Sequence, residues 1–488
     1  MLRQYLEDNE MERLISAGNV QFVGAKDVTF SRLGIGFEKL DRDVFDPEKA
    51  YEKVSEIGVK KIRLQSGWMK TEQQEGIYDF SWLDAIVDKL LSLNMEPWLN
   101  LSYGNPLYTD VARVTFGAVG CPPIGTERET QAWLNYVKAA VAHFKGRIKL
   151  YEIWNEPDLG YSWKHFDGEK LAERDTRQNA LEYGEFARKT ALAIKAADEN
   201  AEVAAFALSR IANLEYVNTA LSTGLADVID YVSFHVYSAT DNKRAQMIHS
   251  LLSIVHLWNP RIRIFQGESG VQSRSDGHGA MKRFSWTPAK QTKMLLRTML
   301  CDLHADLAFT SYFSTMDMIE ALNGRVGDKA SYLDYGYFGV ISAEFDEDGR
   351  ATGNYDRKPS YYALSTLASL LQGESCAADL PYAVESLPSI RVNGRDYDDH
   401  TLQIYPFRLH DGRTMLAYWN GTDILTTTYE GTCSLCVYGQ KNEKIRLCDL
   451  RDGSLYQLPD EMIEDLGNGG VRLRNIPLLD APLALIFG

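Results

Sequence analysis

The sequence predicts an α/β protein, a (β/α)8 TIM barrel with a C-terminal β-sandwich domain. Between residues 31 and 373, eight strand-like segments alternate with helices whose apolar residues recur at helical spacing, which is typical of a closed parallel barrel. After residue 373 the helical spacing fades, and short alternating runs are separated by Asp-Gly and Asn-Gly turns, as in a β-sandwich. No Gly-rich phosphate-binding motif follows a strand, which disfavours an open dinucleotide-binding sheet.

These patterns divide the chain into three predicted parts. Residues 1–30 form an N-terminal segment that we expect to pack on the β-sandwich, since residues 19–30 look extended. Residues 31–373 form the catalytic barrel, and residues 374–488 form the β-sandwich domain. A barrel of about 250 residues or more with one smaller domain fits the length of the chain.

Start and stop signals place the barrel elements in order. Asp46 and Pro47 begin the first helix and Gly58 ends it, while Thr126 and Glu129 form a capping box for the third. The predicted strands are residues 33–37, 59–66, 95–101, 148–154, 203–208, 231–236, 262–266 and 307–313. The predicted helices begin near residues 46, 81, 126, 183, 214, 245, 287 and 358. The predicted sandwich strands are residues 401–405, 414–418, 444–448, 471–473 and 483–487.

Composition limits the classes of function. The 488 residues carry a net charge of −15, which disfavours a nucleic-acid or anionic-membrane partner. No apolar stretch reaches about 18 residues, so we expect no membrane-spanning helix. The N-terminal residues do not resemble a signal peptide and the six cysteines are sparse, so we expect reduced thiols and a cytoplasmic location. Cys433 and Cys436 form a single C-x-x-C, which fits packed thiols better than a zinc site.

Two glutamates at strand ends carry the predicted chemistry. Glu156, in the run W-N-E-P, follows the fourth strand, and Glu268 follows the seventh, across the barrel mouth. A lone strand-end glutamate is most often a surface charge or an ion pair, but two carboxyls about 5–5.5 Å apart define a retaining glycosidase. Asn155 offers an amide to a sugar 2-hydroxyl, whereas Glu152 lies inside the strand and is expected to be structural.

The W-N-E-P motif after the fourth strand and the glutamate at the seventh resemble glycoside hydrolase clan A, and within it family 39, over roughly residues 30–488. The resemblance implies that Glu156 is the acid/base and Glu268 the nucleophile. It also implies that Tyr237 hydrogen-bonds the nucleophile and that His235 lines the same subsite. Arg63 would neutralise the nucleophile side, because a nearby cation keeps a carboxylate ionised. The alternatives are a core histidine for His235 and a barrel ion pair for Arg63.

Side chains at other strand ends are candidates for sugar binding. Glu38 and Lys39, after the first strand, suit bonds to sugar hydroxyls, with helix-capping ion pairs as the alternative. Trp68 and Tyr103, after the second and third strands, could stack on a pyranose ring, with core packing as the alternative. The eighth strand ends at Phe313, where many clan members have a tryptophan, so the floor of the glycone subsite is left open.

Two long loops, residues 102–125 and 314–356, are expected to carry specificity. Aromatic residues of the second loop, with one acid, could wall a pocket: Tyr332, Tyr335, Tyr337, Phe338 and Asp334. We therefore expect exo-action on an oligosaccharide or small glycoside, with β-xylosidase-like activity implied by the resemblance and no metal or organic cofactor. The alternatives are an endo-acting clan A glycanase and a non-catalytic carbohydrate-binding protein on the same scaffold. A homo-oligomer is compatible with the sequence.

Overall fold

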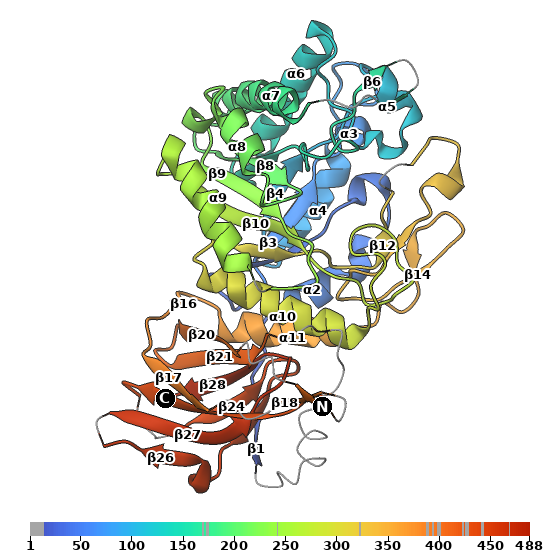
Figure 1. Ribbon diagram of the computed structural model, residues 1–488. Helices are drawn as coiled ribbons and strands as arrows, with labels where there is room; N and C mark the ends of the chain where they lie inside the picture. The colour runs from blue at the N-terminus through green and yellow to red at the C-terminus, as the bar shows by residue number, and fades with distance from the viewer. Residues whose placement is uncertain are drawn as a thin grey trace.

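The structure is a computed structural model. It describes residues 14–488 apart from 168–169, 172–174, 242, 322–323, 387–389, 393–394, 398–401, 422–423, 425–428, 441–443 and 468. It confirms the predicted fold class, because a closed eight-stranded parallel barrel is followed by antiparallel sheets (Figure 1). Residues 1–13 of the predicted N-terminal segment lie outside the described residues.

The barrel is built from eight parallel strands with helices around them. The strands, in chain order, are β2 (Leu33–Gly36), β3 (Lys61–Gln65), β4 (Glu96–Leu101), β5 (Leu150–Ile153), β8 (Glu202–Leu208), β9 (Tyr231–His235), β10 (Arg263–Ser269) and β11 (Thr310–Tyr312). The barrel closes between β11 and β2, which pair in parallel. The helices are α2 (Tyr51–Ile57), α4 (Ser81–Ser92), α6 (Glu127–Phe144), α7 (Thr176–Ala197), α8 (Leu214–Leu221), α9 (Arg244–Trp258), α10 (Pro288–His304) and α11 (Pro359–Leu370).

Capping explains where the helices begin. The Thr126 hydroxyl accepts from the Glu129 amide, as the capping box predicts. Asp46 caps a short 3-10 turn, η2 (Pro47–Lys49), and helix α2 begins only after it. Helix α7 begins earlier than predicted because Asp175, which the sequence analysis did not use, accepts from two backbone amides.

The interior of the barrel has an apolar floor. Trp98 on β4 packs edge-to-face on Phe309 at a centroid distance of 5.1 Å, and Phe309 stacks on Phe265 of β10 at 4.2 Å. Strands β4 and β10 are not neighbours in the sheet, so these rings meet through the interior. Barrels of this kind have filled cores rather than pores.

The C-terminal part consists mainly of two sheets packed on each other. A seven-stranded sheet contains β1 (Ile15–Asn19), β25 (Ser454–Gln457), β24 (Arg446–Asp449), β28 (Leu483–Phe487), β21 (Thr414–Asn420), β20 (Leu402–Arg408) and β16 (Cys376–Ala377). A four-stranded sheet contains β17 (Tyr382–Ser386), β23 (Thr432–Tyr438), β27 (Gly470–Pro477) and β26 (Ile463–Asp465). Their facing side chains form one apolar core, which includes Leu416, Leu435, Leu473 and Leu485.

The N-terminal strand belongs to this part of the molecule. β1 pairs antiparallel with β25, although 435 or more residues separate them in the chain. The strand lies at Ile15–Asn19 rather than within residues 19–30, where the sequence analysis placed extended structure. Cys433 and Cys436 are both buried in β23 as free thiols. The predicted boundary after residue 373 stays a prediction.

Helix α10 joins the barrel to the seven-stranded sheet (Figure 1). Its Arg297 donates from Nη2 to the Asn420 carbonyl at 2.8 Å and from Nε to the Asp480 carbonyl at 2.9 Å. Lys293 pairs with the Asp480 carboxylate at 2.6 Å. Because these groups are buried, the contacts hold the sheet against the outer helices, away from the barrel mouth. No helix within the described ranges has the length and apolarity needed to cross a membrane.

Candidate active site

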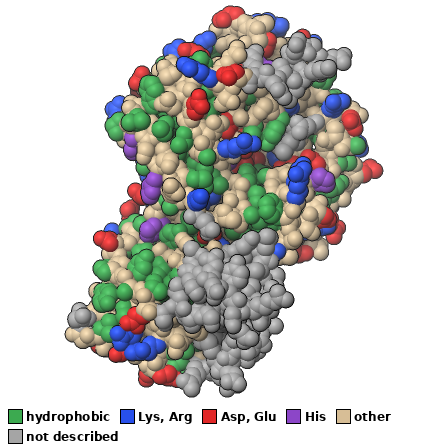
Figure 2. Space-filling model, viewed as in Figure 1, with side chains coloured by type: hydrophobic (Ala, Val, Ile, Leu, Met, Phe, Trp, Pro, Cys, Tyr) green, Lys and Arg blue, Asp and Glu red, His purple; other side chains and the backbone are tan. Residues whose placement is uncertain are grey.

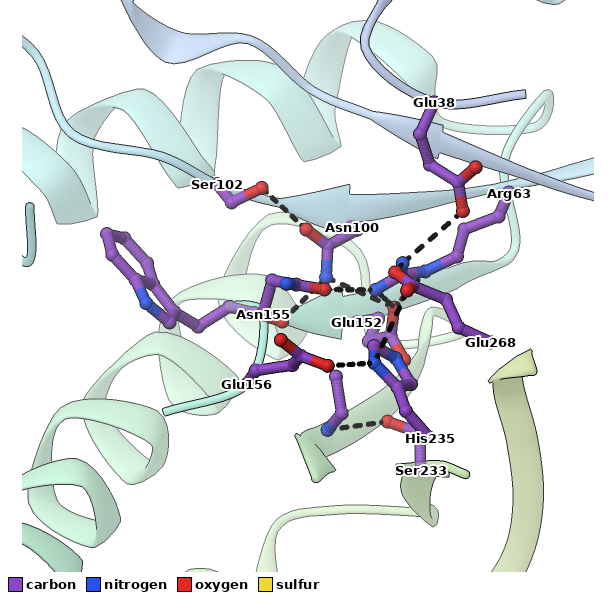
Figure 3. Close-up of polar contacts among 12 residues, drawn as sticks. Glu38, Arg63, Asn100, Ser102, Glu152, Asn155, Glu156, Ser233, His235 and Glu268 are labelled. Carbon is purple, nitrogen blue, oxygen red and sulfur yellow. Dashed lines mark hydrogen bonds and ion pairs between the residues drawn. The ribbon is translucent and has the colours of Figure 1, made fainter. Parts of the chain in front are cut away.

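The two glutamates predicted to act together do meet at the barrel mouth. Glu156 follows β5, and Glu268 lies inside β10, which extends three residues further than expected before it ends at Ser269. An oxygen of Glu156 and an oxygen of Glu268 lie within 4.8 Å of each other (Figure 3). Inverting glycosidases need roughly 6.5–9.5 Å between their carboxyls to admit a water, and retaining ones about 5–5.5 Å. The spacing here is that of the retaining class.

The backbone around Glu156 is held in an uncommon conformation. Trp154 and Glu156 both have positive φ, 66° and 50°, in the left-handed region that non-glycine residues avoid. Buried hydrogen bonds compensate for this strain: the Trp154 indole donates to the Ser162 carbonyl at 2.8 Å, and Asn100 donates to the Trp154 carbonyl at 2.6 Å. The Glu156 amide donates to Ala207 of β8 at 3.1 Å. The W-N-E-P run thus turns the Glu156 carboxyl into the mouth.

Arg63 is the centre of the charge network. From β3 it donates to Glu152 at 2.8 Å, to Glu38 at 3.3 Å, to Asn155 at 3.0 Å and to Glu268 (Figure 3). Its side chain is fully buried. The predicted neutralising contact with Glu268 is therefore present. The alternative, a barrel ion pair, is present as well, because Glu152 binds the same guanidinium. Glu152 lies inside the barrel in an ion pair, as expected for a structural residue.

Two residues from the end of β9 complete the surroundings of the glutamates. The Tyr237 hydroxyl donates to Glu268 Oε2 at 2.7 Å, which is the contact that the resemblance implied. His235 Nδ1 lies 3.0 Å from a Glu156 oxygen and 3.6 Å from a Glu268 oxygen. The His235 side chain is wholly buried beneath the mouth, so it bridges the two carboxyls and does not line the cavity.

These neighbours separate the two carboxyls electrostatically. Burial raises the pKa of Glu156, although its bond to His235 opposes the change. Burial alone would also raise the pKa of Glu268, but His235, Arg63 and the Tyr237 hydroxyl together lower that pKa below its ordinary value. The same carboxylates raise the pKa of His235 against the effect of its burial. Glu156 is thus suited to hold a proton and Glu268 to remain ionised, which is the division of roles that a glycosidase pair needs.

A cavity of about 490 Å³ opens above the glutamates. Glu38, Lys39, Asn155, Tyr103 and Tyr237, all predicted, line it. One Glu38 oxygen binds Arg63, and the other has no hydrogen-bond partner within the described part of the chain. A Cβ added to Gly36 would lie 2.1 Å from that oxygen, so the glycine makes room for the carboxyl. Burial, and then the charge of Glu268, raise the pKa of Glu38 to about 8.

Glu320 was not identified from the sequence. It follows the short strand β12 (Met318–Ile319) in the loop after β11, where no motif marks it. It lines the cavity, and its Oε2 lies 3.4 Å from Lys39 Nζ. Burial raises its pKa to about 7. Gly279 and Gly336 would each clash with its carboxyl if they carried a Cβ, and this glycine environment could have been recognised only in three dimensions.

Trp68 is a correction, because its ring does not reach the cavity. It is fully buried, stacks on Tyr108 and Tyr136 at centroid distances of 5.5 Å, and donates from its indole to Glu72 at 2.6 Å. The reason is local: Gly67 has φ 59° and turns the chain after β3 into the short helix α3 (Trp68–Thr71), which points the indole into the core. The packing alternative was therefore the right one for this residue.

Tyr103 does line the cavity, but the Arg42 guanidinium lies 5.6 Å from its ring centroid and occupies one of its faces. In the loop after β11, the predicted aromatic wall is wrong. Tyr332 stacks on Phe116 and Tyr335 contacts Phe345, so these rings hold loops together. Of the five loop residues that were predicted to wall a pocket, only Asp334 lines the cavity. Phe313, at the end of the eighth strand, also lines it.

Glu156, His235 and Glu268 also form a three-ligand set that a metal ion could bind. Arg63 and the Tyr237 hydroxyl already hold the two Glu268 oxygens, and the buried guanidinium opposes a second cation at this carboxylate. The arrangement therefore fits a proton donor beside an anionic nucleophile better than a metal centre.

Comparison with known proteins agrees with this geometry. The family model described as glycosyl hydrolases family 39 matches residues 41–255. A β-xylosidase of Geobacillus stearothermophilus is 26% identical over 178 residues, which are 34% of this chain and 32% of that protein. A β-galactosidase of Clostridium cellulovorans, BgaA, is 37% identical over 78 residues, 15% of this chain and 12% of that protein. The chain thus spans about a third or less of these curated relatives.

Solved structures match over almost the whole chain. A family 39 glycoside hydrolase from Bacteroides cellulosilyticus WH2 has a TM-score of 0.64 at 17% identity, with coverage of 96% of this chain and 82% of that one. A family 39 β-xylosidase from Caulobacter crescentus has a TM-score of 0.57 at 17% identity, with coverage of 97% and 98%. Identities this low show a shared fold. The family match lies within the barrel, so the barrel of this protein is similar in sequence to family 39 glycoside hydrolases over residues 41–255 and shares their fold.

Proposed function

We propose that the protein is a retaining β-glycosidase that removes single sugars, with β-xylosidase-like activity. The observation that carries this proposal is the pair Glu156 and Glu268, whose oxygens approach within 4.8 Å and whose pKa values are moved in opposite directions. Glu156 and Glu268 match the two roles of a double displacement, which needs one neutral and one ionised carboxyl.

In the first step, a Glu268 oxygen attacks the anomeric carbon while Glu156 gives its proton to the departing glycosidic oxygen. A covalent glycosyl-enzyme forms and the aglycone leaves. In the second step, Glu156, now ionised, takes a proton from water, which attacks the same carbon and releases Glu268. Tyr237 and Arg63 hold the Glu268 carboxylate in place, and Asn155 is positioned to bond a 2-hydroxyl.

The cavity favours recognition of one sugar in detail. Glu38, Lys39 and Glu320 bring two buried carboxyl groups and an ammonium group to its inner end, and a few precisely placed polar groups of this kind fix the orientation of a bound sugar. Glu38 Oε2 and Glu320 Oε1 have no partner among the described residues, so a sugar hydroxyl could satisfy each of them. The loops after β2 and β11 enclose part of the cavity, which supports exo-action. The β-xylosidases among the similar proteins support xylose as the first sugar to test.

The test is a screen of aryl glycosides, including the β-xyloside, β-glucoside, β-galactoside and α-arabinoside. Proton NMR of the first product should show the anomeric configuration of the substrate, which is the β-anomer for the β-glycosides. Glu268→Gly should abolish turnover, and added azide should restore a reaction that yields the α-glycosyl azide. Glu199→Gln, an exposed surface change, is the matched control. Inversion at the anomeric carbon, or a Glu268→Gly variant with full activity, would refute the proposal.

An endo-acting glycanase is separated by the products from a xylo-oligosaccharide. Exo-action releases monosaccharide from the first time point, whereas endo-action releases shorter oligosaccharides first. A non-catalytic binding protein would retain affinity for the oligosaccharide with no turnover in either assay.

A further inference from the structure

Two cationic side chains at the rim of the cavity are not used by the proposed reaction. Arg210 and Lys282 both line the cavity and are exposed. Within the described part of the chain, neither side chain has an ion-pair or hydrogen-bond partner. In a chain with a net charge of −15, two unpaired cations that face one cavity need a reason. Figure 2 shows Lys and Arg side chains beside a hollow of the barrel face in which acidic side chains gather.

The inner cations of the cavity differ from this pair. Lys39 is bound to Glu320 and to the Ile319 carbonyl at 3.1 Å, and Arg42 is bound to Gln65. Their charges are therefore committed to the protein. A ligand group with negative charge would be repelled by the carboxyls of the inner cavity and would find free positive charge only at the rim.

Arg210 lies on the side of the leaving group. It follows β8, and the preceding residue, Ser209, donates from its amide and its hydroxyl to Asp158, both at 2.9 Å. Asp158 is two residues beyond Glu156, the proposed proton donor. These hydrogen bonds hold the loop that carries Arg210 next to Glu156. Because the proton donor lies on the side from which the aglycone departs, Arg210 lies on that side as well.

Lys282 reaches the same rim from the loop after β10. Its neighbours Met281 and Arg283 both have positive φ, 60° and 82°. Local bonds hold this uncommon backbone: Gln272 donates to the Ala280 carbonyl at 3.0 Å, and the Trp286 indole donates to the Met281 carbonyl at 2.8 Å. Non-glycine residues with positive φ concentrate at functional sites, where the surrounding structure stabilises them.

We infer that Arg210 and Lys282 form a subsite for an anionic group on the aglycone, a carboxylate or a phosphate, so that acidic glycosides are favoured over neutral ones. A guanidinium suits both groups because it can donate two parallel hydrogen bonds, and the lysine adds a mobile point charge. The preference for acidic glycosides rests on the proposed function, because it concerns their hydrolysis. The inference extends that function to recognition of the leaving group.

The kinetic test compares three aryl glycosides of one glycone, whose aryl group carries a 4-carboxylate, a 4-phosphate or the neutral methyl ester of the acid. The measured quantity is kcat/KM for each charged substrate divided by that for the neutral one. Leaving-group reactivity cancels when this ratio in a variant is divided by the wild-type ratio. Exposed charge pairs contribute up to about 1 kcal/mol, so Arg210→Gln and Lys282→Gln should each lower the ratio about 3- to 5-fold.

The double variant should lower the ratio about tenfold, and 0.5 M NaCl should lower it in the wild type but not in the double variant. Arg283→Gln, an exposed change in the same loop that does not line the cavity, is the matched control and should leave the ratio unchanged. A preference for only one of the two charged substrates shows whether the subsite binds a carboxylate or a phosphate. Ratios that do not move in either single variant or in the double variant would overturn the inference.

A binding measurement separates this inference from the proposed function. Titration of the wild-type protein with 4-hydroxybenzoate and with phenyl phosphate, followed by ligand NMR, needs no turnover. If no glycoside is hydrolysed but both Arg210→Gln and Lys282→Gln weaken this binding, the anion subsite stands and the proposed function fails. Equal binding by wild type and double variant refutes the subsite even when neutral glycosides are hydrolysed.

Discussion

Replacement of Glu38 by Gln tests the charge balance around Arg63. One buried guanidinium faces three buried carboxyls, those of Glu38, Glu152 and Glu268. Burial, followed by the charge of Glu268, raises the pKa of Glu38 to about 8 from its ordinary value of 4.5. The folded protein therefore retains a proton on Glu38 that the unfolded chain releases. Because the folded pKa is the higher one, the stability contributed by this proton is complete below about pH 4.5 and is lost as the pH rises through about 8.

The size of the effect follows from this pKa. One pKa unit corresponds to about 1.36 kcal/mol, so between pH 5 and pH 8 the wild type should lose about 3 kcal/mol of unfolding free energy through this group. Gln cannot ionise, and its amide oxygen can still accept from Arg63. Glu38→Gln should therefore gain about 3 kcal/mol relative to wild type over this range.

The assay is urea unfolding of both proteins at half-unit steps of pH, with Glu199→Gln as an exposed control. Wild type and Glu38→Gln profiles that run parallel from pH 5 to pH 8 would show that Glu38 is ionised in the fold and that the reasoning is wrong. A difference that appears only below pH 4.5 would have the opposite sign and would contradict it equally.

Three further predictions concern the site and its core. Glu156→Gln should reduce kcat/KM about 10²–10⁴-fold for glycosides with poor leaving groups and much less for activated aryl glycosides, and it should abolish the fall in activity at high pH that deprotonation of Glu156 causes. Tyr237→Phe removes a charge-assisted bond worth about 1.5–3 kcal/mol, so kcat/KM should fall about 10- to 100-fold and the acid limb, set by Glu268, should move to higher pH. Trp68→Phe should lower the unfolding free energy by about 2–4 kcal/mol, measured in urea, with KM unchanged, whereas a raised KM would place its ring in the subsite after all.

Local signals predicted the barrel well because they act within a few residues. The capping box at Thr126 and the alternation of strands and helices depend on spacing alone, and both are present in the structure. Glu156 and Glu268 could be paired in advance because strand order in a barrel fixes which ends face each other. The cytoplasmic location and the oligomeric state have no such local signal in the chain and stay predictions.

The predictions were wrong where the direction of a side chain mattered. Trp68 follows a strand as a subsite residue would, but one left-handed glycine turns its indole into the core. Tyr332 and Tyr335 lie in the predicted specificity loop, yet their rings pack on other loops. A rotation about a single backbone bond decides between cavity and core, and spacing along the chain does not encode it.

Spacing along the chain was enough to predict the fold class and the pair Glu156 and Glu268, because periodicity and strand order follow from short-range geometry. The three-dimensional arrangement of the site was needed to assign the proton to one of these carboxyls. That choice depends on burial and on His235, Arg63 and Tyr237, which arrive from other strands. It also decided which loop residues face the cavity, and so brought together Glu320, Arg210 and Lys282. Electrostatic energies depend on distances in space, and residues separated by many positions in the chain set those distances here.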